Sequence, residues 1–174
     1  MKALILAAVI IFSSIPVFAK DGAAREDDLW ISSGAETAMY SISGIIFGGS
    51  LAMAYGSGAS TGLKASVFID PEHDLNVLEF NFLFRLYFSG KTSCSGPFIQ
   101  FTGGPVLFFQ PGSGAVFPAK VGSVSAGISL GWRILLGNIF FIETSVRGGY
   151  PYITGADFSA GMRFLSQGKN TDEE

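Results

Sequence analysis

The stretch LNVLEFNFLFRLYF, residues 75–88, carries the clearest indication of the fold. One alternating series of this stretch, which ends at Phe88, consists of one Asn, two Leu and four Phe. The other series mixes bulky residues with Glu79 and Arg85. Because a β-strand directs alternate side chains to opposite faces, the stretch predicts a strand with one apolar face and one mixed face.

The environment of this strand is indicated by the composition of its two faces. In a water-soluble sheet the solvent face carries the charges and the core face is apolar. Here the uniform face is a row of Phe, and the charges share the other face with bulky residues. This arrangement is typical of a strand that has hydrocarbon outside and a packed polar lumen inside.

The composition supports a single all-β domain. The chain has 174 residues, and only 14% of them are charged, against roughly 25% in an ordinary soluble domain. Its 23 Gly and 17 Phe suit turns and aromatic strands better than helices. The net charge of -3 provides no basic surface for nucleic acid. The single cysteine, Cys94, excludes a disulfide within the chain.

The N-terminus predicts export. A basic start is followed by an apolar run over residues 3–12, and Val17-Phe18-Ala19 then supplies small residues of the kind that signal peptidase recognises. We therefore expect residues 1–19 to be a signal peptide that is cleaved after Ala19. The alternative, an uncleaved anchor helix, would need about 20 apolar residues.

The remaining chain divides into strand-length segments separated by Gly, Ser, Pro, Asn and Asp. We expect residues 20–28 to be a flexible lead, residues 29–164 an eight-stranded antiparallel up-and-down barrel, and residues 165–174 a polar tail. Pro105 requires a bulge or an unpaired position, since proline cannot donate to a ladder. The expected strands are 30–40, 45–56, 61–70, 75–88, 97–110, 121–134, 139–148 and 153–164.

Charged residues within these strands share the face opposite the apolar series, and the two signs balance. We hypothesise that they pair in a narrow lumen, because an unpaired charge there would be costly. The alternative is a soluble sandwich whose charges face water. The residues are Glu36, Lys64, Asp70, Glu79, Arg85, Arg133, Glu143, Arg147, Asp157 and Arg163.

Aromatic residues near the strand ends predict girdles at two membrane interfaces. The predicted girdle residues are Trp30, Tyr40, Tyr55, Trp132, Tyr150, Tyr152 and Phe164.

The last predicted strand ends in FSAGMRF, residues 158–164. This motif is similar to the terminal signal that small eight-stranded outer-membrane proteins of diderm bacteria, the class of OmpX, OmpW and the OmpA barrel, present to the barrel-assembly machinery. The chain resembles that class over about residues 29–164, although ten residues follow Phe164. The phrases GYPY (149–152) and YGSGAS (55–60) also resemble treponemal outer-membrane barrel proteins.

The resemblance implies a transmembrane barrel in the bacterial outer membrane. Its implied partners are outer-membrane lipid and, during insertion, the barrel-assembly machinery, and no oligomer is expected. Some barrels of this class are enzymes that use a His with a Ser and an acid. The single histidine, His73, lies in a turn between two acids, so we expect no catalytic, cofactor or metal site.

Three functions stay open at this point. The first is a structural or envelope role for an outer-membrane barrel whose lumen is plugged by a charge network. The second is a narrow, porin-like channel for small apolar solutes. The third is a soluble, secreted, lipocalin-like barrel that binds a ligand. A surface adhesin is disfavoured, because most of the predicted outer loops are short.

Overall fold

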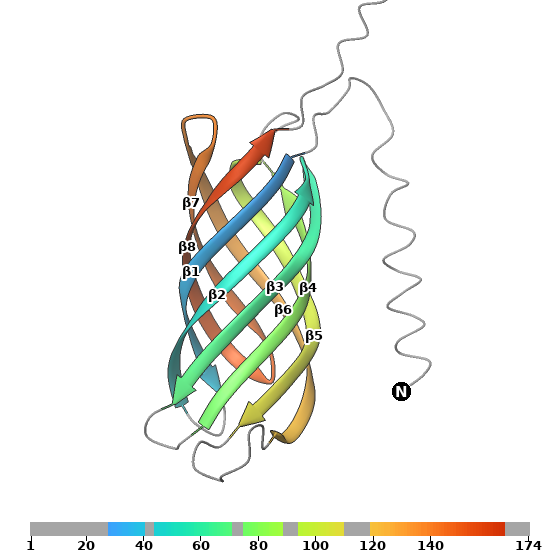
Figure 1. Cartoon of the computed structure of the whole chain (residues 1–174), viewed down its shortest axis with the longest axis vertical. Coiled ribbons are helices and arrows are strands. Elements are labelled where there is room, and N and C mark those ends of the chain that lie inside the picture. Colours follow the sequence, from blue (N-terminus) through green and yellow to red (C-terminus); the bar gives the residue numbers. More distant parts are fainter. Residues whose placement is uncertain (1–27, 41–43, 71–74, 89–93, 110–118, 166–174) are drawn as a thin grey trace, which may run out of the picture.

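Eight antiparallel strands close into a barrel in the computed structural model, which describes residues 28–40, 44–70, 75–88, 94–109 and 119–165 (Figure 1). Each strand pairs with its neighbours in sequence, and β8 pairs with β1 to close the sheet. This confirms the predicted fold class. The strands are β1 (Asp28–Tyr40), β2 (Gly44–Gly56), β3 (Ala59–Asp70), β4 (Leu75–Tyr87), β5 (Gly96–Phe109), β6 (Ala119–Leu136), β7 (Phe140–Tyr150) and β8 (Tyr152–Leu165).

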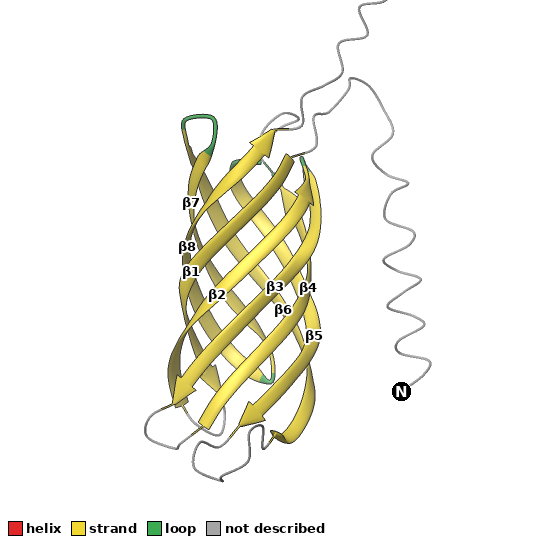
Figure 2. Cartoon of the chain, viewed as in Figure 1, coloured by secondary structure: helices red, strands yellow, loops and turns green. Residues whose placement is uncertain are grey.

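Strands account for nearly all of the described chain, as the yellow arrows of Figure 2 show. The described residues contain no helix that is long and apolar enough to cross a membrane. Each strand begins and ends close to its predicted bounds, but β1 takes in Asp28 and β8 takes in Leu165. The predicted signal peptide, the rest of the lead and residues 166–174 lie outside the described part of the chain.

Pro105 occupies an interruption in one ladder. It pairs with Val124 of β6, whereas the β4–β5 register passes from the Glu79–Val106 pair directly to the Phe82–Gly103 pair. The adjacent Gly104 is required here, because a Cβ on it would lie 1.9 Å from the carbonyl oxygen of Phe80. The two backbones therefore approach closely where proline leaves the ladder unpaired, as the sequence required.

The two faces of the wall differ as β4 predicts. Phe80 and Phe82 are 48% and 61% exposed on the outside, whereas Glu79 and Arg85 are buried in the lumen. Large apolar side chains stand exposed on all eight strands, so the apolar surface encircles the barrel.

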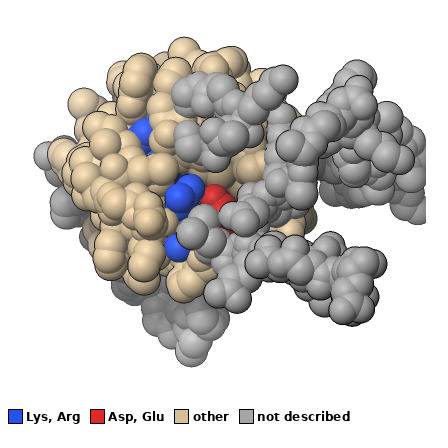
Figure 3. Space-filling model, turned by 90° about the horizontal axis from the view of Figure 1, so that it is seen from above, with Lys and Arg blue, Asp and Glu red and all other residues tan. Residues whose placement is uncertain are grey.

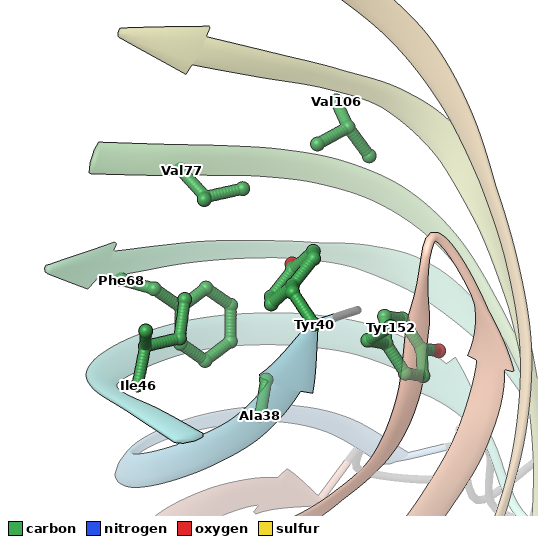
Figure 4. Packing of buried hydrophobic residues seen from close by; sticks show 7 residues of the cluster. All are labelled: Ala38, Tyr40, Ile46, Phe68, Val77, Val106 and Tyr152. Atoms are coloured by element: carbon green, nitrogen blue, oxygen red, sulfur yellow. The ribbon is translucent and has the colours of Figure 1, made fainter. Parts of the chain in front are cut away.

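Two apolar clusters lie inside the barrel, one in each half. We call the end where β1 begins and β8 ends the terminal end, and the opposite end the distal end (Figure 1). The cluster in the terminal half consists of Trp30, Ala52, Ala54, Leu83 and Phe141. The cluster in the distal half, shown in Figure 4, consists of Ala38, Tyr40, Ile46, Phe68, Val77, Val106 and Tyr152.

Candidate functional site: the charged lumen

Nearly all of the charged residues assigned to the lumen are buried there. Nine of the ten are classed as buried, and the side chain of Arg163 is 13% exposed. Seen from the terminal end, the visible charged side chains lie within the outline of the uncharged wall (Figure 3). The nine are Glu36, Lys64, Asp70, Glu79, Arg85, Arg133, Glu143, Arg147 and Asp157.

One group of charges, which we call the distal ionic layer, comprises Glu36, Lys64, Glu79, Arg147 and Asp157. Glu36 and Asp157 face each other across the β1–β8 register. The Lys64 ammonium pairs with Glu36 and lies 3.2 Å from Asp157 Oδ2. Nη1 of Arg147 lies 3.0 Å from Glu79 Oε2 and 3.8 Å from Glu36 Oε2. Each cation therefore touches two carboxylates.

Apolar and polar neighbours hold the distal ionic layer in place. The Tyr40 hydroxyl donates to Glu79 Oε1, and Asn81 Nδ2 donates to Oε2 of the same carboxylate at 3.3 Å. The Arg147 guanidinium lies 4.0 Å from the ring centre of Tyr152. Tyr40 and Tyr152 belong to the distal apolar cluster (Figure 4), which therefore covers this layer directly.

A second group of charges, which we call the terminal ionic layer, comprises Arg85, Arg133 and Glu143. Arg85 forms a bidentate pair with Glu143, with Nη1–Oε2 at 2.8 Å and Nη2–Oε1 at 3.1 Å. Arg133 Nε donates to the same Oε2 at 2.8 Å, and Ser159 donates to Oε1 at 3.1 Å. Two arginines thus share one carboxylate. Gln100 Oε1 accepts from Arg85 Nη2 at 2.6 Å.

Aromatic rings surround the two arginines of the terminal ionic layer. The Arg133 guanidinium carbon lies 3.7 Å from the ring centre of Phe141 and 4.3 Å from that of Trp30. The Arg85 guanidinium carbon lies 4.0 Å from the ring centre of Phe98 and 4.6 Å from that of Trp30. The negative faces of these rings attract the cations, and desolvation strengthens the attraction.

A separate ion pair sits at the terminal rim. Arg163 Nη1 lies 3.3 Å from Asp28 Oδ2, and Arg163 Nε donates to the carbonyl oxygen of Asn138 at 2.9 Å. Sequence reasoning placed Asp28 in the flexible lead and so missed this pair. The sequence contained a signal for it. Asp28 and Glu36 are an even number of residues apart, so a strand places both side chains on the same face.

Part of the predicted aromatic girdle is wrong. Trp30, Tyr40 and Tyr152 are 0–1% exposed and point into the lumen. Trp30 and Tyr40 alternate in step with Glu36, so their parity places them on the lumen face. Tyr152 turns inward because the β1–β8 register shifts next to Tyr40. The other predicted girdle residues are exposed on the outer wall, namely Tyr55, Trp132, Tyr150 and Phe164.

Two uncharged lumen residues that hydrogen-bond to the charged side chains were not predicted from the sequence. Asn81 and Gln100 carry no charge and lie on the mixed face of their strands. Their parity places them inside the barrel, but their partners depend on the stagger of strands around the closed sheet. Alternation within a single strand does not contain that information.

The described residues contain no group of three or more His, Cys, Asp or Glu side chains arranged to hold a metal ion. His73, the residue considered for catalysis, belongs to a segment that the structure does not describe.

Comparison with protein-family models and with curated proteins found no match. Comparison with solved structures found small barrels. The chain has the fold of the small outer-membrane β-barrels. One similar structure is neisserial surface protein A (NspA), at 14% identity, 84% coverage of this chain, 100% of that chain and a TM-score of 0.54. Another is the outer membrane protein OprG from Pseudomonas aeruginosa, at 12% identity, 83% and 99% coverage and a TM-score of 0.56.

Proposed function

We propose that this protein is an integral outer-membrane β-barrel with a structural role in the cell envelope, and that its lumen is plugged. The observation that carries the proposal is the inversion of the two faces. Large apolar side chains stand exposed on every strand, while nine charged side chains are buried in the lumen. A soluble barrel would have the opposite arrangement, with its charges on the outer wall.

Strand length supports membrane residence. A tilted transmembrane strand needs about 9–11 residues, and the shortest strand here, β7, has 11. Closure also leaves no sheet edge with unpaired backbone groups, which hydrocarbon does not tolerate. The start of β1 and the end of β8 both lie at the terminal end (Figure 1). We assign that end to the periplasm.

The ionic contacts across the lumen support a structural role over transport. Charges in the distal ionic layer engage one another across β1, β3, β4, β7 and β8. The terminal ionic layer joins β4, β6 and β7 in the same way. Eight strands enclose an interior that is just wide enough for side chains to fill or for one small ligand, and here charged side chains from several strands meet across it. We therefore propose a closed barrel without catalytic activity.

Membrane residence is tested by folding. The mature chain is refolded from urea with and without phospholipid vesicles and then run on gels unheated and boiled. We expect the unheated protein to migrate as a compact species only when it is folded with vesicles or detergent. A compact, soluble species that forms in buffer alone would instead support the lipocalin-like alternative.

The plugged lumen is tested separately by recording from planar lipid bilayers. We expect no steady conductance at low voltage. Steady channels would refute the plug and favour the narrow channel for small solutes, while the membrane assignment would stand.

A further inference from the structure

We propose that the terminal ionic layer binds one small monovalent anion, such as a halide, beside Arg133 and Trp30. Within the described part of the chain, two buried hydrogen-bond donors at this layer lack acceptors. Arg133 Nη1 and the indole N–H of Trp30 have no hydrogen-bond partner among the described residues, although the two residues are only 1% and 0% exposed. Buried donors without a protein partner are rare, and such a donor usually binds a water molecule or an ion.

Glu143 cannot supply the missing acceptor. A carboxylate offers about four lone-pair sites, and four hydrogen bonds already occupy this one. Oε1 accepts from Arg85 and Ser159, and Oε2 accepts from Arg85 and Arg133. Arg133 Nη2 lies 2.7 Å from the same Oε2 but is not aligned for a hydrogen bond, so this corner of the guanidinium is also poorly satisfied.

The charge count of the layer favours an anion over a water molecule. Arg85 and Arg133 carry two positive charges against the single negative charge of Glu143. A water molecule can accept a hydrogen bond, but it adds no negative charge beside the two guanidinium groups. The local surplus of the terminal layer is otherwise balanced only from a distance, by the extra carboxylate of the distal ionic layer. One monovalent anion would supply both the acceptor and a negative charge in contact with Arg133.

The distal ionic layer does not supply the missing charge by contact. Its three carboxylates are engaged by Lys64 and Arg147, and no ion pair joins Arg133 to any of them among the described residues. An acceptor in contact with Arg133 Nη1 must therefore come from solution. The terminal end is the nearer entrance, because Arg133 lies three residues before the end of β6 and Trp30 two residues after the start of β1.

Trp30 provides the test, because iodide quenches indole fluorescence on contact. The chain contains two tryptophans, so a Trp132→Phe background leaves Trp30 as the only reporter. Iodide is titrated into the folded protein at constant ionic strength, with sulfate as the balancing anion. We expect quenching that saturates, as it does for binding at a site, and that chloride reverses by competition.

Two variants locate the site. Arg133→Gln should abolish the saturable component, whereas Arg163→Gln, which removes a cation at the rim, should retain it. Quenching that is absent, or that is linear in iodide and insensitive to chloride, would overturn the proposal even if Arg133→Gln fails to fold. This result would leave the membrane assignment intact, since the gel assay of the folded barrel does not depend on anion binding.

Discussion

The two ionic layers of the lumen stabilise buried charge in different ways. In the distal layer each cation touches two carboxylates, and the polar atoms of Tyr40 and Asn81 support them. In the terminal layer one carboxylate serves two arginines, and the faces of Trp30, Phe98 and Phe141 lie against these two arginines. One layer is redundant, whereas the other depends on a single acid.

This difference concerns tolerance to substitution more than total interaction energy. A buried ion pair adds little net stability over an apolar replacement, but removing one partner leaves an uncompensated charge. The distal layer can lose one acid and keep each cation paired. The terminal layer cannot, so the two layers should respond unequally to matched substitutions.

Glu143→Gln should have the largest effect. Among the residues that the structure describes, it removes the only carboxylate that contacts Arg85 and Arg133, and loss of one partner of a buried pair costs about 3–5 kcal/mol. We expect a loss of that size in the free energy of unfolding, measured by urea titration of the vesicle-folded protein with circular dichroism. A loss below about 1 kcal/mol would mean that the aromatic rings or a bound anion already stabilise both cations.

Trp30→Leu should have the next largest effect. Trp30 contacts both guanidinium groups, and each desolvated cation–π contact contributes about 2 kcal/mol. We expect a loss of about 2–4 kcal/mol in the same urea titration. Trp132→Leu is the matched control, because Trp132 is 53% exposed on the outer wall. Equal losses in the two variants would remove any special role for the aromatic faces of the terminal layer.

Glu36→Gln should have a smaller effect, although Glu36 is as deeply buried as Glu143. Lys64 retains Asp157, and Arg147 retains Glu79, so neither cation is left alone. We expect a loss of about 1.5–3 kcal/mol, typical of one hydrogen bond to a charged group. If Glu36→Gln proves as damaging as Glu143→Gln in paired unfolding curves, the distal layer is not redundant.

Alternation in the sequence was sufficient to predict the fold and the facing of the charges. Glu79, Arg85 and Glu143 follow a period of two in strands whose other face is apolar, so each strand could be oriented separately. The partners could not be predicted. The pairing of Arg85 with Glu143 joins residues 58 positions apart, and it depends on how far the strands are staggered around the barrel.

The aromatic errors have a related cause. Trp30 was assigned to the outer girdle because it lies near a strand end, where aromatic residues often gather. Its even spacing from Glu36, which places both side chains on the lumen face, was given less weight. Inside the barrel it covers two guanidinium groups instead. Tyr152 could not have been placed by parity alone, because the register shift opposite Tyr40 changes the face on which it lies.

Substitution of Cys94, which lies among the turns of the terminal end, should have the smallest effect on stability. Its thiol donates to the carbonyl oxygens of Ser57 at 3.0 Å and Gly56 at 3.3 Å, which ties the β4–β5 connection to the β2–β3 turn. Serine can make the same hydrogen bonds, so Cys94→Ser should change the free energy of unfolding by less than about 1 kcal/mol. A larger loss would show that the fit of the sulfur matters more than its hydrogen bonds.

The pH dependence of this thiol is a sharper measurement. Burial, assisted by the negative charge of Asp28, raises the pKa of Cys94 from 9.0 to about 11. Since the thiolate is the reactive form, iodoacetamide should alkylate the folded protein slowly at pH 8 and the urea-unfolded protein much faster. Because the folded state holds its proton more tightly, the contribution of Cys94 to stability should be complete below pH 9 and decline as the pH rises toward 11. Cys94→Ser should lack this decline, and equal alkylation rates in the folded and unfolded protein would mean that the terminal turns open freely to solvent.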